Sequence, residues 1–201
     1  MTITWPPVAF ELTSPPRLLV RSPRDRIERA GVPLAVFEPK TFEGVFSVME
    51  RLGVLTGRER EAGEAVAGLR ARLRAVKEKA PASSGRRPSV FFEVRAEPLA
   101  AAGGGSIADQ IIAAAGGENV VTDARPIVQM NVEALLMREP DLYVVQKGPM
   151  NPNPRDPKRR PHVERLRAVR EGRVLVVDEM VFSRPGPRAV EAVEILARAL
   201  A

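Results

Sequence analysis

The spacing of apolar residues changes along the chain. Between Thr41 and Lys79, apolar side chains recur at helical spacing, with arginine and glutamate between them, which predicts amphipathic helices. Thr41 suits a helix cap, because its hydroxyl oxygen can accept a backbone N–H. Gly57 breaks or kinks the run. We therefore expect two amphipathic pieces that together make one long helical segment.

From Ser89 onward, short continuous apolar runs alternate with helical segments. Such runs predict strands covered on both faces, and the alternation predicts an α/β fold with a parallel sheet. Residues 81–88, PASSGRRP, have the composition of a linker. The expected strands are Val32–Phe37, Ser89–Val94, Asn119–Val121, Leu142–Gln146 and Val174–Asp178. The other expected helices are Asp25–Ala30, Ser106–Ala115, Asn131–Arg138, Pro161–Arg170 and Pro187–Leu200.

Composition narrows the class of protein. The 201 residues are 44% hydrophobic, which is enough for one sizeable core. No stretch approaches the roughly 20 apolar residues that a membrane span needs. The N-terminus has no basic region followed by an apolar run, so it does not have the pattern of a secretory signal. We expect either a cytoplasmic protein or a chain whose export signal was removed or lies outside these residues.

Charge and side-chain chemistry exclude several functions. The net charge of +6 comes mostly from arginines interleaved with glutamates, which is typical of a solvated, ion-paired surface. Aromatic residues make up 4% of the chain, so nucleic-acid binding is not expected. The absence of cysteine excludes disulfides, thiolate metal sites and cysteine nucleophiles. The single histidine, His162, excludes a histidine-rich metal site, and we expect it to be polar surface rather than a metal or haem ligand.

Three loops carry residue types that can bind a ligand. Gly103–Ser106 could present backbone N–H groups to an anion, or could be a plain turn in which Ser106 and Asp109 cap a helix. Ser183–Arg188 could bring an arginine to the carboxyl end of the sheet, or could be a turn built on proline and glycine. We interpret the basic, proline-rich loop Asn151–Pro161 as a mobile surface insertion. No catalytic triad, paired carboxylates or nucleotide motif stands out, so an enzyme is not expected.

Five segments occur in a specific order: AGVPLAVFEPKTFEGV, LGVLTGRE, EPLAAAGGGSIADQIIAAAGGENVV, VQMNVEALLMREPDLYVV and VLVVDEMVFSRPGPRAVEAVEILARAL. Together they resemble the periplasmic binding proteins for cobalamin, haem and iron-siderophores, over about residues 26–201. The resemblance implies two Rossmann-like lobes joined by a long helix, with the ligand in the cleft between them. It implies a remnant of the N-terminal lobe at 1–39, a connector helix at 40–80 and a Rossmann-like C-terminal lobe with a central parallel sheet at 81–201. Most of the N-terminal lobe is then absent from this chain.

The resemblance also implies roles for individual residues. Glu133 lies in the first turn of its helix, where the helix dipole alone stabilises a carboxylate. Family members use a glutamate at this point to dock on arginines of the permease of an ABC importer. The implied cleft-facing residues are Leu99, Ala100, Ile127, Val128, Phe182 and Arg184. The side chains at Leu99–Ala100 and Ile127–Val128 are aliphatic, which argues against stacking on a flat macrocycle. Arg184 suits an anionic chelate.

The leading hypothesis is a substrate-binding component of an ABC importer for a cobalamin- or iron-chelate-type ligand. It would have no cofactor of its own and would work in the periplasm or at the cell surface. One alternative is a degenerate or cytoplasmic α/β module that senses a ligand or binds a partner. A weaker alternative is an enzyme that holds a phosphate at Gly103–Gly105. Without most of an N-terminal lobe, part of the apolar stripe of the connector is expected to be uncovered, which favours a homodimer.

Overall fold

The computed structural model describes residues 23–79 and 85–201, and the chain divides into two compact units, 1–37 and 38–201. In the described part of the first unit, α1 (Pro23–Arg29) confirms the predicted helix. The strand predicted at Val32–Phe37 is wrong. This segment is exposed coil, with Val32 53% and Val36 51% exposed. An isolated strand has no neighbour for its backbone N–H and C=O groups, so an apolar run alone does not make one.

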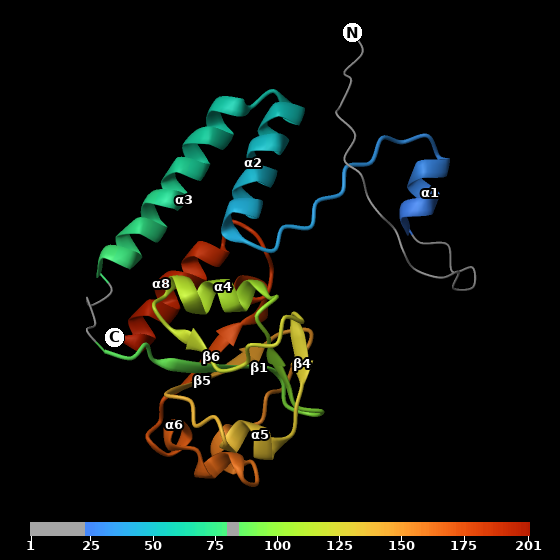
Figure 1. Ribbon diagram of the computed structural model, residues 1–201. Coiled ribbons are helices and arrows are strands. Elements are labelled where there is room, and N and C mark those ends of the chain that lie inside the picture. The colour runs from blue at the N-terminus through green and yellow to red at the C-terminus, as the bar shows by residue number, and fades with distance from the viewer. Residues whose placement is uncertain (1–22, 80–84) are drawn as a thin grey trace. The chain divides into compact units, whose positions relative to one another are not determined.

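Two helices, not one, make up the connector region. In α2 (Phe42–Thr56), the Thr41 hydroxyl oxygen accepts the Gly44 N–H at 3.0 Å, as predicted. Gly57 ends α2 with a φ of 67°, a left-handed conformation that glycine adopts without steric cost. The chain reverses there, and α3 (Glu59–Lys79) runs back beside α2 as a helical hairpin (Figure 1).

The hairpin is attached to the rest of its unit mainly through α3. Phe46 is fully buried between the helices, with the guanidinium carbon of Arg70 5.2 Å from its ring centroid. Arg70 also pairs with Glu43 on α2 at 2.6 Å. Arg72 donates two hydrogen bonds, of 2.7 and 2.8 Å, to Glu194 on α8 (Ala189–Leu200). Such exposed pairs each contribute about 0.2–1 kcal/mol, so they fix orientation more than stability.

A single sheet occupies the centre of the second unit, in the order β4-β2-β1-β5-β6 with β3 beside β1. The predicted parallel arrangement is confirmed for β1, β3, β5 and β6. The two strands that sequence patterns missed, β2 and β4, are antiparallel to their neighbours, so the sheet is mostly rather than wholly parallel. The strands are β1 (Ser89–Arg95), β2 (Ala100–Ala102), β3 (Glu118–Asn119), β4 (Ile127–Gln129), β5 (Leu142–Lys147) and β6 (Val174–Asp178).

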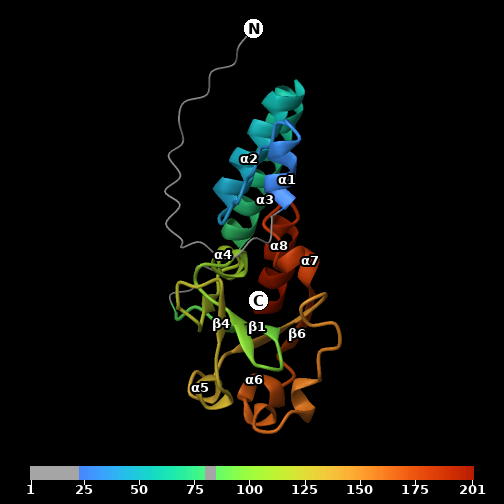
Figure 2. The same cartoon turned by 90° about the vertical axis from the view of Figure 1, so that its right-hand side faces the viewer.

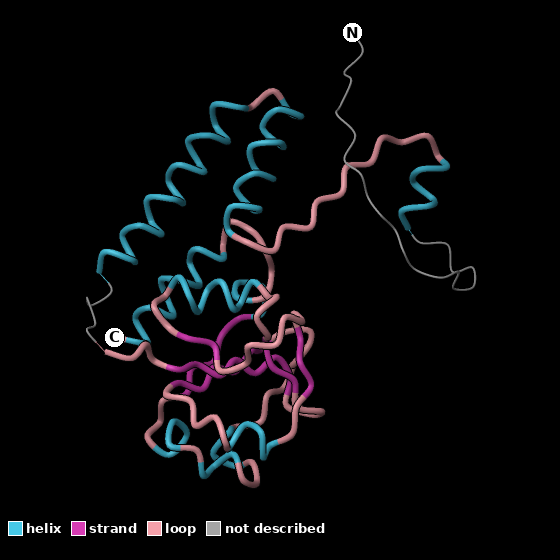
Figure 3. Tube along the Cα trace, in the orientation of Figure 1, coloured by secondary structure: helices cyan, strands magenta, loops and turns pink. Residues whose placement is uncertain are grey.

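Helices cover both faces of this sheet, as Figures 1 and 3 show. One face carries α8 together with α4 (Ile107–Ala114) and α7 (Glu179–Phe182). The other carries α5 (Val132–Leu136), α6 (Arg167–Arg170) and two 3₁₀ turns, Pro157–Arg159 and Val163–Arg165 (Figure 2).

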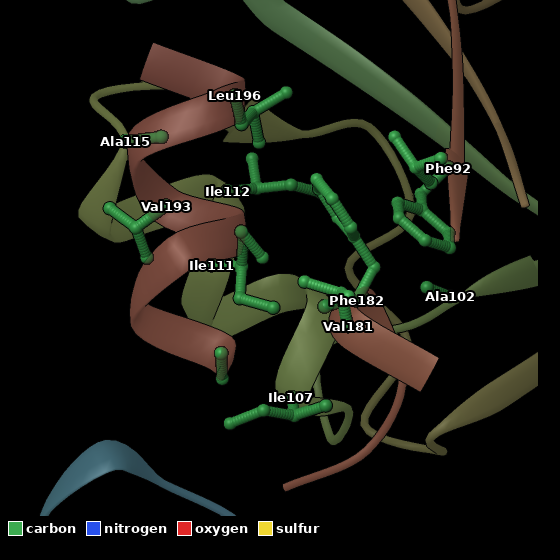
Figure 4. Packing of buried hydrophobic residues seen from close by; sticks show 14 of the residues in the cluster. Phe92, Ala102, Ile107, Ile111, Ile112, Ala115, Val181, Phe182, Val193 and Leu196 are labelled. Carbon is green, nitrogen blue, oxygen red and sulfur yellow. The ribbon is translucent and has the colours of Figure 1, made fainter. Parts of the chain in front are cut away.

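Consecutive residues of β1 supply the two cores. Phe92 packs with Ile111, Ile112 and Leu196 on the α8 side (Figure 4). Phe91 packs with the cluster on the α6 side. This alternation follows from the period of two residues in a strand.

The helix predicted at Pro161–Arg170 is wrong as a single element. The chain has a φ of 71° at His162, which no α-helix contains, and Leu166 is extended, with a ψ of 134°. These two residues divide the segment into a 3₁₀ turn and the four-residue helix α6. His162 is exposed, as expected for a polar surface residue. No helix in the described ranges is long and apolar enough to cross a membrane.

Asp141 ties the starts of the two central strands together. Its carboxylate accepts the Ser89 N–H and hydroxyl, each at 2.8 Å, and pairs with Arg86 at 2.8 Å and Arg167 at 2.6 Å. Burial alone would raise the pKa of this carboxyl, but the Ser89 donors and the Arg86 guanidinium outweigh burial and hold the pKa below its usual value. Asp141 is therefore a stabilising charge at the amino edge of the sheet.

Replacing Asp141 with asparagine should lower the free energy of unfolding by about 1.5–3 kcal/mol at neutral pH, because charge-assisted hydrogen bonds are lost. The wild-type advantage is complete above the unfolded-state pKa of about 3.9. It should shrink as the pH falls through the lower folded-state pKa. Urea denaturation across this range checks the prediction, with the exposed Glu171→Gln as control. A difference between wild type and Asp141→Asn that does not depend on pH would contradict it.

Candidate functional site

Three loops meet at the carboxyl edge of the sheet, the place where open α/β sheets bind ligands. They follow β1, β5 and β6 and span residues 96–99, 148–160 and 179–188, of which the second contains the 3₁₀ turn Pro157–Arg159 and the third begins with the short helix α7. Since these three strands are parallel, their carboxyl ends lie at the same edge. We call this set of loops the carboxyl-edge site.

Direct contacts interlock the three loops. Arg155 of the second loop pairs with Glu97 of the first at 2.8 Å, and both side chains are largely exposed. The Met150 N–H of the second loop donates to a carboxylate oxygen of Glu179 in the third, at 2.7 Å. Gly148 is required beneath this contact, because a Cβ atom there would overlap the Glu179 side chain. The surface is thus organised before any ligand arrives.

The third loop combines a buried carboxylate with an exposed arginine. Glu179 is 1% exposed, and the guanidinium of Arg184 lies 3.5 Å from its carboxylate while remaining largely open to solvent. The Ser183 hydroxyl donates to the side-chain oxygen of Gln146, at the end of β5. Glu179 therefore orients the Arg184 guanidinium at the edge and leaves it accessible to a ligand.

A buried polar cluster anchors the second loop beneath the sheet. Glu93 on β1 is fully buried and forms an ion pair with Arg160, which is 8% exposed. The Tyr143 hydroxyl donates to the same carboxylate at 2.5 Å. Burial, reinforced by the Glu93 charge, raises the pKa of Tyr143 well above its usual value, so the hydroxyl remains a donor. The loop 151–161, which we interpret as a mobile surface insertion, is held at both ends: the Asn151 side-chain amide donates to the Gln146 carbonyl at 2.9 Å, and Arg160 pairs with Glu93.

Four of the six predicted ligand-contacting residues are buried. Leu99, Ala100, Val128 and Phe182 are 7%, 1%, 8% and 1% exposed. Phe182 packs against Phe92 with 6.2 Å between ring centroids, in the core on the α8 side (Figure 4). Their side chains are part of the hydrophobic core, so they could reach a ligand only if that core opened. The contact of these four residues with a ligand stays a prediction.

The remaining two predicted ligand residues are exposed but are not brought together. Ile127 is 42% exposed on β4, at one end of the strand order. Arg184 follows β6, at the other end. Three residues of the predicted set, Leu99, Phe182 and Arg184, lie in the carboxyl-edge site, and of these Arg184 is the one that is exposed.

Sequence patterns missed Glu93, Glu97, Arg155, Arg160 and Glu179. One signal was available: Glu93 interrupts the apolar run SVFFEV, and a buried carboxylate needs a positive partner.

Glu133, the predicted docking residue, is exposed in the first turn of α5. The side chain of Asn131 accepts the Ala134 N–H at 2.9 Å, which confirms the predicted cap. The Glu133 carboxylate is therefore not used to cap the helix and projects from a short, fixed element.

The Gly103–Ser106 loop is a structural turn in this fold. The Gly103 N–H donates to the Pro126 carbonyl, and the Gly104 N–H donates to the Asp123 carbonyl at 2.7 Å. A side chain at Gly103 or Gly105 would overlap the backbone of residues 123–125. The Ser106 hydroxyl oxygen accepts the Asp109 N–H at 3.1 Å. The Ser106 N–H also donates, to the Gly103 carbonyl. With three of its four amides already bonded, the loop does not offer the open cradle that a phosphate needs.

Two hollows mark the surface of the second unit. The larger, about 680 Å³, lies between residues 121–123 and the β4–α5 segment and includes Gln129 and Asn131. The smaller, about 480 Å³, lies between the second loop and the edge of the sheet at Val174 and Val176. Within residues 23–79 and 85–201, no group of three or more histidine or acidic side chains is placed to hold a metal ion.

The chain belongs to the periplasmic binding protein family, whose sequence profile matches residues 14–181. It is 29% identical over 178 residues to an uncharacterised ABC transporter substrate-binding lipoprotein, YvrC, of Bacillus subtilis, covering 87% of this chain and 56% of YvrC. It is 24% identical to a vitamin B12-binding protein of Vibrio campbellii, over 63% of this chain and 46% of that protein. The chain thus spans about half the length of the curated relatives it matches.

Solved structures of the same class share the fold. A periplasmic haem-binding protein of Pseudomonas aeruginosa superposes with a TM-score of 0.77 and 26% identity, over 89% of this chain and 68% of that one. The vitamin B12-binding protein BtuF of Vibrio cholerae superposes with a TM-score of 0.71 and 21% identity, over 89% of this chain and 69% of that one. At the latter identity the likeness concerns the fold alone.

Proposed function

We propose that the chain is a substrate-binding component of an ABC importer for a metal chelate of the cobalamin, haem or siderophore type. It captures the ligand and delivers it, and it makes or breaks no bond. The observation that carries the proposal is the carboxyl-edge site: three loops locked together by Glu97–Arg155 and by Glu179, in a chain of the periplasmic binding protein family. Relatives and structural neighbours that bind vitamin B12 or haem support the ligand class.

The charge of the carboxyl-edge site favours an anionic group on the ligand. Arg155 and Arg184 are exposed in its second and third loops, and Lys147 is exposed at the end of β5. Guanidinium groups bind carboxylates and similar anions through paired hydrogen bonds. Aromatic side chains for stacking on a macrocycle are not exposed in these loops, since Phe182 is buried. The proposal therefore places ionic contacts, rather than stacking, at this edge.

Delivery requires a surface that the permease can recognise, and we propose Glu133 for this role. Its exposure and its position on a capped helix support the proposal. A fixed surface charge contributes mainly to the rate and orientation of association. The enzymatic alternative, a phosphate held at Gly103–Gly105, has less support, because the amides of that loop are engaged with backbone carbonyls.

One of cobalamin, haemin or a ferric hydroxamate siderophore should raise the melting temperature of the chain. At a ligand concentration of 100 times Kd the stabilisation is about 2.7 kcal/mol, which corresponds to about 5–10 °C for a chain of this size. The Arg184→Ala variant should lose most of the shift. Arg170→Ala, an exposed arginine at the opposite edge of the sheet, should retain it. A shift with ATP or NAD, and with none of the three chelates, would contradict the proposal.

Charge reversal at Glu133 should slow docking on the cognate permease without loss of stability. We expect Glu133→Arg to weaken association about tenfold or more at low salt and to change the free energy of unfolding by less than about 0.5 kcal/mol. The measurement is binding of the chain to the transporter in lipid nanodiscs, followed by surface plasmon resonance. The control is Glu171→Arg, an exposed carboxylate next to α6. Equal binding by the two variants would show that Glu133 is not part of the docking surface.

A further inference from the structure

Helix α5 presents two neighbouring stripes of side chains. The first consists of Glu133 and Met137, which are four positions apart and therefore lie on the same side of the helix, and both are exposed. Met137 is 87% exposed, the highest value among the large apolar side chains that the structure describes. Methionine is enriched where proteins bind one another, because its flexible side chain adapts to the surface of a partner.

The second stripe, Ala134 and Arg138, lines the larger of the two hollows, which has a volume of about 680 Å³. Val121 and Val128 line the same hollow and are buried. Arg138 is held in position, since its Nε donates to the Val120 carbonyl at 3.0 Å and its Nη1 to the Ala134 carbonyl at 2.6 Å. The third nitrogen, Nη2, has no partner in the described part of the chain and is available to a bound molecule.

The hollow is rich in groups that can donate hydrogen bonds. The Asn131 side-chain oxygen caps α5, which leaves its amide N–H groups without a partner among the described residues. The side chains of Thr122 and Gln129 also line the hollow and form no hydrogen bond within residues 23–79 and 85–201. The carboxylate of Asp123, in the same lining, already accepts three hydrogen bonds from Arg125. A partner that supplies acceptors therefore fits this hollow better than one that supplies donors.

The hollow is open rather than enclosed. Its polar lining residues, Thr122, Asp123, Gln129, Asn131 and Arg138, are all exposed. A site for a small molecule usually buries most of the ligand, so this hollow is poorly suited to one. A loop of another protein suits it better, because loop carbonyl groups are not all used by a helix or a sheet and need donors.

We propose that α5 and the larger hollow together bind one loop of the permease, and we call this surface, formed by Thr122, Gln129, Asn131, Glu133, Met137 and Arg138, the α5 face. The loop places a basic side chain on Glu133, an apolar side chain on Met137 and backbone carbonyls in the hollow, where Arg138 and the side-chain amides donate to them. The inference rests on the proposed function, because it takes Glu133 as the residue that meets the permease. It adds the short-range contacts that hold the complex together once charge has oriented the partners.

Two substitutions test the α5 face without changing Glu133. Met137→Gln removes the apolar contact and keeps the length of the side chain, and Gln129→Trp fills the hollow from an exposed position. The matched controls are Leu55→Gln, at a residue 52% exposed on α2, and Glu78→Trp, at an exposed residue on α3. Binding of each variant to the cognate permease in lipid nanodiscs is followed by surface plasmon resonance, and urea denaturation checks that each variant is folded.

Met137→Gln and Gln129→Trp should each bind about tenfold more weakly than the wild type. The loss should come mainly from faster dissociation, because short-range contacts act after the encounter. Leu55→Gln and Glu78→Trp should bind as the wild type does. Equal binding by Met137→Gln and Leu55→Gln, or by Gln129→Trp and Glu78→Trp, would overturn the α5 face.

Failure of this inference can be told apart from failure of the proposed function. If the wild type binds, Glu133→Arg weakens binding and the two α5-face variants do not, the α5 face is wrong and the docking role of Glu133 stands. If the wild type does not bind the permease at all, both are overturned.

A second measurement uses the wild-type chain and does not depend on any variant. Hydrogen peroxide converts an exposed methionine to its sulfoxide, and mass spectrometry follows this reaction at Met137. Saturation with the permease should protect Met137, and undiminished oxidation would exclude it from the interface. Sedimentation covers the other occupant, because a wild-type dimer that Met137→Gln dissociates would assign the face to a second copy of the chain and overturn the proposal.

Discussion

A buried ion pair between Glu93 on β1 and Arg160 at the end of the second loop fixes the position of that loop in the carboxyl-edge site. Two charges removed from water are costly unless each is paired and hydrogen-bonded. Here they satisfy each other, and the Tyr143 hydroxyl adds a further donor. The other oxygen of Glu93 has no partner among the described residues, so the loss of Arg160 would leave a buried negative charge with the Tyr143 hydroxyl as its donor and no positive partner. The loop therefore has one favourable position.

The second loop contributes residues to two surfaces of its unit. Toward the carboxyl ends of the strands, it places Arg155 against Glu97 and Met150 against Glu179. Along β6, the same loop forms the outer wall of the smaller hollow. Functional residues commonly lie on loops that a rigid scaffold positions.

Features set by near neighbours in the sequence were predictable. Thr41, Ser106 and Asn131 cap helices, because a cap depends on residues three positions apart. Features set by distant residues were not. The ion pair of Glu93 and Arg160 joins residues that are 67 positions apart, and no periodicity encodes it. The surroundings of Phe182 also come from distant residues. We expected this residue to face the ligand, whereas its ring lies in the core on the α8 side.

Amide hydrogen exchange of residues 148–160 in a Glu93→Gln variant tests the central claim most directly. Glutamine keeps the size of the side chain and its bond to Tyr143, but it removes the negative charge that holds Arg160 in the interior. The account predicts that Arg160 moves to solvent, and that the loop amides exchange about tenfold faster or more while β1 and β5 keep their protection. Unchanged exchange throughout the loop would contradict it, because the ion pair would then not be what anchors the carboxyl edge.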